Sequence, residues 1–172
     1  MGSIKFNAAE VLQIAEQIER NGAFFYRAAA EAVADPAAAA LLKELADWEV
    51  GHEKTFARMR ARLPEQATQS DTFDPDGDAA RYLQAFADGQ VFDVNAGDPA
   101  EFFRRPRTLS EILREALARE HDAIVLFTAM RDVVPESQGR SEVEAVIREE
   151  VQHVFQITRM LCEAETRPGE RK

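Results

Sequence analysis

Hydrophobic side chains recur every three to four residues in four long stretches of the chain, which is the period of an amphipathic helix. In the first stretch Val11, Leu12, Ile18 and Phe25 form such a stripe. Each stretch is longer than a typical strand, so the pattern favours helices over a sheet. The predicted helices cover residues 7–34, 36–63, 108–135 and, from a start between 137 and 141, on to about 165.

Capping and helix-breaking residues bound these four stretches. Asn7 and Thr108 each stand three residues before a glutamate, which is the capping-box pattern of a helix start. Asp35-Pro36 supplies a cap and a first-turn proline for the second helix, and Pro64 ends that helix. Because so tight a turn joins the first two helices, we expect them to lie antiparallel.

A long connection, residues 64–107, separates the second helix from the third. It is too long for a hairpin loop and suits a crossover along a helix bundle, with one short helix near 78–88. The acidic run at 74–78 is interpreted as a turn, because Ala85 stands where a calcium loop would need a glutamate. The sequence thus predicts one all-α domain, 1–172, a four-helix bundle of two antiparallel hairpins, 7–63 and 108–166, joined by the crossover 64–107.

Charge and cysteine content narrow the function classes. A formal net charge of -10 opposes binding to nucleic acid or to an anionic membrane surface. The single cysteine, Cys162, excludes an intrachain disulfide, a four-cysteine zinc site and a rubredoxin-type iron centre. No apolar run approaches the roughly 18 residues that span a bilayer, and no signal-peptide core is present near residue 1, so we expect a cytoplasmic protein.

The two hairpins repeat each other at a constant offset of 101 positions. Asn7 and Glu10 correspond to Thr108 and Glu111 at the helix starts. The same offset relates further residues in the helix interiors, which are Glu19 and Glu120, Glu49 and Glu150, and His52 and His153. The chain is therefore interpreted as a duplicated helical hairpin.

The repeated residues form the pattern of a dinuclear metal site. Within each hairpin the first glutamate precedes the second by 30 residues, with the turn near midway, so antiparallel helices bring the two carboxylates to the same height. Glu-x-x-His in each second helix puts a carboxylate and an imidazole on one helix face. Four carboxylates and two imidazoles from a four-helix bundle are the ligand set of a di-iron or di-manganese carboxylate site. Oxygen-rich ligands suit iron or manganese, and the lack of thiolate argues against structural zinc. The predicted ligands are Glu19, Glu49, His52, Glu120, Glu150 and His153.

Surface glutamates placed by chance are the alternative. With 20 glutamates in 172 residues, the chance that all four stand at these places relative to two of the three histidines is under about one in a thousand. Apolar neighbours such as Ile18 and Ile124 also predict that the glutamates are buried, and buried carboxylates need counter-charge, which two divalent metal ions would supply. The third histidine, His121, has no such partner and is expected to be exposed.

Three segments resemble the rubrerythrin branch of the ferritin-like superfamily. They are Ile18-Glu19-Arg20-Asn21-Gly22-Ala23-Phe24-Phe25-Tyr26, Trp48-Glu49-Val50-Gly51-His52 and Glu150-Val151-Gln152-His153. The resemblance implies a ferritin-like bundle that holds two iron ions per chain, with manganese or zinc as substitutes, on the six ligands named above. It also implies a di-iron oxidoreductase that reduces hydrogen peroxide or dioxygen.

Two departures from that family bear on the activity. Rubrerythrins carry a rubredoxin domain with paired cysteines, which this sequence lacks, so the resemblance implies an external electron donor such as a separate rubredoxin or a reductase. They also carry an extra carboxylate one turn after the third-helix glutamate, where this chain has Ala123. A ferroxidase or iron-storage protein, and a structural bundle with a vestigial site, are therefore the other hypotheses. A surplus of hydrophobic residues on long helices suggests a homodimer.

Three residues beside the ligands are candidates for supporting roles. Tyr26 lies two turns after Glu19 on the same face and is a candidate catalytic residue, either as a hydrogen-bond donor to a ligand carboxylate or as an electron carrier. A core aromatic is the alternative for Tyr26. Glu16, one turn before Glu19, could accept a hydrogen bond from a ligand imidazole, but it is interpreted as a surface residue because its repeat partner is Leu117. Trp48 is interpreted as a packing or interface residue rather than an electron relay.

Overall fold

The computed structural model describes residues 7–68 and 103–166. These residues form four long helices and two short 3-10 turns. The elements in chain order are α1 (Ala8–Ala32), α2 (Pro36–Ala61), η1 (Glu65–Ala67), α5 (Leu109–Val133), η2 (Glu136–Gln138) and α6 (Arg140–Thr166).

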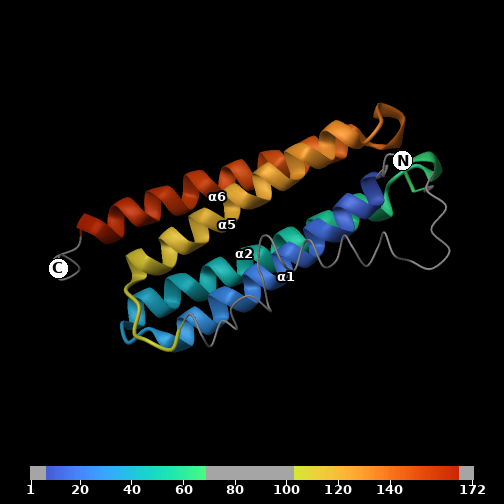
Figure 1. Ribbon diagram of the computed structural model, residues 1–172. Coiled ribbons are helices and arrows are strands. Elements are labelled where there is room, and N and C mark those ends of the chain that lie inside the picture. The colour runs from blue at the N-terminus through green and yellow to red at the C-terminus, as the bar shows by residue number, and fades with distance from the viewer. Residues whose placement is uncertain (1–6, 69–102, 167–172) are drawn as a thin grey trace.

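The helices pair as two antiparallel hairpins. Figure 1 shows α1 beside α2 in one layer and α5 beside α6 in the other, with the end of α2 and the start of α5 at opposite ends of the bundle. Packing is most extensive within each hairpin, and α1 touches both α5 and α6 across the layers. The all-α four-helix bundle expected from the sequence is confirmed.

Side-chain caps start the helices where the sequence predicted. At α1 the Asn7 carboxamide accepts a hydrogen bond from the Glu10 amide at 3.0 Å, and the Glu10 carboxylate accepts one from the Asn7 amide at 3.0 Å. Thr108 and Glu111 form the same reciprocal pair at α5, at 3.2 and 3.0 Å. Each capping box satisfies two backbone donors that the first helical turn leaves unpaired.

Helix α6 begins at Arg140 because Gly139 sets the chain direction there. Gly139 is left-handed, with φ at +91°, and a Cβ at this position would lie 2.6 Å from the Cβ of Ala8. Only glycine fits both the backbone angle and this close approach. The turn thereby holds the start of α6 against the start of α1.

The core between the layers is mostly apolar, and a band of acidic and histidine side chains lies within it. Leu12, Leu42, Leu113 and Phe127 are among its fully buried members.

Within residues 7–68 and 103–166, no helix combines the length and the apolar character that crossing a bilayer requires. The acidic run at 74–78 and the short helix expected near 78–88 lie outside the described residues.

Candidate metal centre

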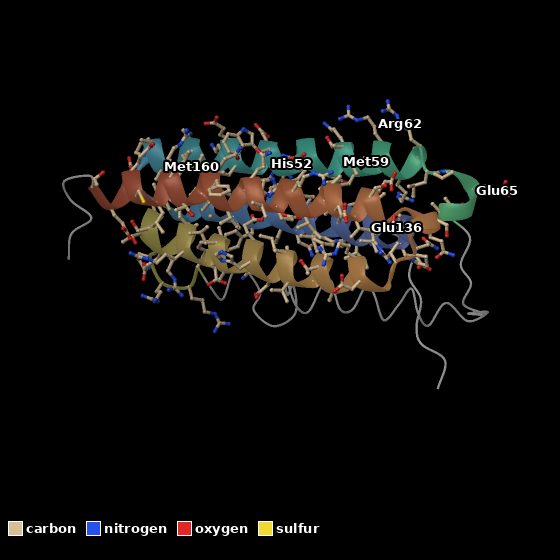
Figure 2. The ribbon with its side chains drawn as sticks, turned by 90° about the horizontal axis from the view of Figure 1, so that it is seen from above. His52, Met59, Arg62, Glu65, Glu136 and Met160 are labelled. Atoms are coloured by element: carbon tan, nitrogen blue, oxygen red, sulfur yellow. The ribbon has the colours of Figure 1, made fainter. Side chains whose placement is uncertain are left out.

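All six predicted ligands lie in one cluster inside the bundle. Each long helix contributes to it, with Glu19 from α1, Glu120 from α5, and a Glu-x-x-His pair from each of α2 and α6. The four carboxylates and His153 are buried, and His52 is the most exposed member, with 24% of its side chain accessible. Figure 2 shows His52 near the middle of the bundle's length, where α2 and α6 lie next to each other.

His153 stands at the centre of the cluster. Its Nδ1 lies 3.3 Å from an oxygen of Glu120 and 3.2 Å from an oxygen of Glu150. Its Nε2 lies 2.9 Å from Nδ1 of His52, and the two rings are 4.2 Å apart between centroids. The two histidines separated by 101 residues, which the repeat predicted to converge, are therefore in direct contact.

His52 lies near both glutamates of the first hairpin. Its Nδ1 lies 3.9 Å from an oxygen of Glu19 and 4.0 Å from an oxygen of Glu49. The histidine nitrogens of both repeats thus lie within about 4 Å of the carboxylates of their own hairpin.

Several carboxylate oxygens in the cluster have no hydrogen-bond partner among the described residues. Both oxygens of Glu19 and Oε1 of Glu150 are buried and have no such partner. Such groups are costly to bury, and a cation is the partner that a carboxylate accepts most readily. The donor set therefore fits a metal.

Two overlapping groups of three ligand atoms could each hold an ion. One is Glu49, His52 and His153, the other is Glu19, Glu150 and His153, and the atoms of each group lie within 4.8 Å of one another. Metal–ligand distances of roughly 2.0–2.2 Å place two ligands of one ion at most about 4.4 Å apart, so small side-chain movements would complete either site. Glu120 belongs to neither group and contacts His153 directly.

Burial and mutual repulsion control the charges of these groups. Burial raises the pKa of Glu19 well above its usual range, and the charge of Glu49 adds to the effect. Burial likewise raises the pKa of Glu49 and of Glu120, and that of Glu150 to about 7. Four carboxyl groups that resist ionisation together would be stabilised as carboxylates by added positive charge.

The two histidines titrate in opposite directions despite their equivalent places in the repeat. Burial and, to a lesser extent, the charge of the neighbouring His153 together lower the pKa of His52 to about 4. Burial also lowers the pKa of His153, but hydrogen bonds and charges from Glu120 and Glu150 outweigh it and raise that pKa to about 11. The cluster is therefore electrostatically asymmetric.

Tyr26 is buried in the core next to this cluster. Its side chain is inaccessible to solvent, and its hydroxyl has no hydrogen-bond partner within the described part of the chain. Burial raises its pKa, and the charges of Glu120, Glu49 and Glu19 raise it further. The hydroxyl is thus a protonated donor close to the ligands, and its catalytic role stays a prediction.

The structure corrects the prediction for Glu16 and adds Gln156 to the residues beside the cluster. Glu16 is buried, and the prediction of a surface residue is wrong, because its carboxylate accepts hydrogen bonds at 2.6 and 3.0 Å from the Arg60 guanidinium of α2. The signal was its place one turn before Glu19 on the inward face. Gln156 lies beside the two histidines, and its place one turn after His153 is the sequence signal for it. His121 is exposed, as expected.

A small cavity adjoins the histidines between α2 and α6. It measures about 10 Å³ and is lined by side chains that include Trp48, His52, His153 and Gln156. Trp48 is half-buried and packs against the core, as the sequence indicated.

Comparison with known proteins supports the fold. No family model and no curated protein match the chain. The chain is similar to a crystal structure from Thermotoga maritima, of a protein named as a ferritin-like diiron-carboxylate protein, with a TM-score of 0.59 and 23% sequence identity, covering 95% of this chain and 99% of that one. The four-helix bundle of this chain thus has the ferritin-like arrangement.

Proposed function

We propose that the chain is a non-haem di-iron oxidoreductase, rubrerythrin-like, that reduces hydrogen peroxide or dioxygen. Two iron ions per chain would be held by Glu19, Glu49, Glu120, Glu150 and the two histidines. The observation that supports this most strongly is the buried cluster of four carboxylates around two touching imidazoles, in which oxygens of Glu19 and Glu150 have no hydrogen-bond partner among the described residues. When bound as ferrous ions, the pair supplies one electron from each ion, which with two protons reduces one hydrogen peroxide to two waters.

The chain's own residues would position this chemistry. Glu120 and Glu150 hold the His153 ring from its Nδ1 side, which leaves Nε2 directed toward His52 and the first hairpin. The unpartnered oxygens of Glu19 and Glu150 are available to coordinate. The buried hydroxyl of Tyr26 could donate a hydrogen bond to a ligand carboxylate, and Tyr26→Phe tests this through a slower peroxide reaction at unchanged iron content.

Metal analysis joined to rapid mixing tests the proposal. The chain is loaded anaerobically with Fe²⁺, its iron content is measured, and its oxidation by hydrogen peroxide is followed in a stopped-flow spectrometer. We expect two ions per chain and fast oxidation without any partner. Glu49→Ala and Glu150→Ala should lose the metal pair, whereas Glu144→Ala, at an exposed position of α6, should keep it. Unaltered iron content in Glu150→Ala would show that the ligand assignment is wrong.

Re-reduction should depend on a separate electron donor. With a single cysteine the chain cannot build a rubredoxin-type centre of its own. Sustained turnover with peroxide should therefore require an added rubredoxin or reductase. NADH-driven turnover by this chain alone would contradict that dependence.

A ferroxidase or iron-storage role is the second candidate, and the charge of the molecule favours it. The net charge of -10 attracts cations, and Glu44 and Glu163 line a surface groove near the cluster. Uptake of many irons per chain under air would support storage, whereas saturation at two would support the oxidoreductase.

The proposed protein is a homodimer located in the cytoplasm. Phe24, Val125 and Phe155 are large apolar residues that are 55%, 69% and 72% exposed, which fits a homodimer. Sedimentation velocity would measure the association, and cell fractionation would test the proposed cytoplasmic location.

A further inference from the structure

The cavity between α2 and α6 has the size of a very small molecule. Its volume of about 10 Å³ is close to the room that one water needs. Leu45 and Ile157 form apolar walls. The wall toward the cluster is formed by Glu49, His52 and His153, which are one of the two groups that could hold an ion. An occupant would therefore touch the metal ligands directly, and it would have to be small.

Gln156 gives this cavity a hydrogen-bond acceptor. The amide side chain lines the cavity, and its Oε1 is buried with no hydrogen-bond partner in the part of the chain that the structure describes. Buried acceptors without a partner are rare in folded proteins because losing hydration without a replacement costs free energy. A small neutral molecule with an O–H group would satisfy it.

A larger groove lies at the surface beside Trp48. The groove measures about 250 Å³, and its walls include Leu41, Leu109 and Met160, with the polar groups of Glu44 and Arg159. Trp48 lines both spaces, and it is the single tryptophan of the chain. In Figure 2, His52 and Met160 follow each other along the line where α2 and α6 meet, Met160 lying toward the C-terminal end of α6. The groove and the cavity thus share Trp48 as a wall, and the cavity in turn contacts the two histidines.

We propose that hydrogen peroxide reaches the cluster between α2 and α6, past Trp48, and is held by a hydrogen bond from its O–H to Oε1 of Gln156. The inference rests on the proposed di-iron function and narrows its substrate. Hydrogen peroxide is small, neutral and a hydrogen-bond donor, whereas dioxygen cannot donate to Gln156 and tert-butyl hydroperoxide is too large for the cavity.

Oxidation rates of the ferrous protein test the path by size and by hydrogen bonding. We expect Trp48→Ala to raise the rate with tert-butyl hydroperoxide at least tenfold while changing the rate with hydrogen peroxide little. Gln156→Leu should slow hydrogen peroxide by about 2- to 10-fold, the range expected for one lost hydrogen bond, and leave the dioxygen rate unchanged. Gln152→Leu makes the same substitution at an exposed position of the same helix, so it is the matched control and should change none of the three rates.

A binding measurement that needs no turnover complements the rates. In the zinc-loaded Cys162→Ser protein, hydrogen peroxide should shift the one indole N–H signal in a proton–nitrogen spectrum, and tert-butyl hydroperoxide should not. Gln156→Leu should weaken that shift.

The outcomes separate the path from the function. If iron loads and peroxide oxidises it, but the indole signal does not move and both variants react at the unmodified rates, the path is overturned and the di-iron function stands. If the ferrous protein does not react with peroxide at all, the proposed function fails and the path fails with it.

Discussion

Replacing Glu150 with glutamine should stabilise the metal-free protein at alkaline pH while it abolishes metal binding. Burial raises the pKa of Glu150 from 4.5 to about 7 in the folded chain. A carboxyl group whose pKa is raised on folding stabilises the native state fully below pH 4.5, and this contribution is lost as the pH rises through 7. At 1.36 kcal/mol per pKa unit, the loss totals about 3 kcal/mol.

The pH dependence distinguishes this effect from a general change in packing. The wild-type protein should have lost about 1 kcal/mol of this contribution at pH 5.5 and about 3 kcal/mol at pH 8. Glutamine cannot ionise, so the difference in unfolding free energy should move in favour of Glu150→Gln by about 2 kcal/mol between these pH values. This corresponds to a relative shift of about 4–8 °C in melting temperature.

Urea unfolding of the chelated proteins, followed by circular dichroism at pH 5.5 and pH 8, measures the difference. Glu144→Gln removes the same charge from an exposed position of α6 and is the control, for which no such trend is expected. A difference between Glu150→Gln and wild type that is the same at both pH values would refute the argument that a buried carboxylate weakens the metal-free fold.

Three further predictions concern metal and packing. Chelation should lower the melting temperature, because a metal at a hundredfold excess over its dissociation constant adds about 2.7 kcal/mol to stability, and identical melting curves would count against a buried site. Glu16→Ala should cost about 1–3 kcal/mol in urea unfolding through loss of the hydrogen bonds from Arg60, with iron content unchanged. Gly139→Ala should destabilise by more than about 1 kcal/mol, since its φ is +91° and its Cβ would crowd Ala8, and calorimetry would detect the lower melting temperature.

The sequence was sufficient to predict the four helices and to predict that the six ligand residues lie close together. Local signals define helix starts such as Asn7 and Thr108, and the 101-residue repeat relates His52 to His153 without any knowledge of packing. Because the ligand positions recur in both halves, the repeat carries information about contacts between distant parts of the chain.

Features that break the repeat could not be predicted in this way. The pairing of Glu16 with Arg60 joins residues 44 apart on different helices, and no repeated partner signals it. His52 and His153 are equivalent in sequence, yet one is partly exposed and the other is held between two carboxylates. Such differences depend on how the two hairpins are packed, which a single sequence does not state.

The contact between His52 and His153 has an evolutionary consequence. Each half of the chain brings two glutamates and one histidine, so an ancestral hairpin that paired with its own copy could have assembled the whole ligand set by two-fold symmetry. Fusion of two copies would have released every other position from that symmetry. Trp48 now faces Gln156 across the cavity, whereas their counterparts in the opposite halves are Glu149 and Thr55. A symmetric ancestor would have had two equivalent pockets beside the histidines, so the difference between Trp48 and Glu149 would have arisen after the fusion.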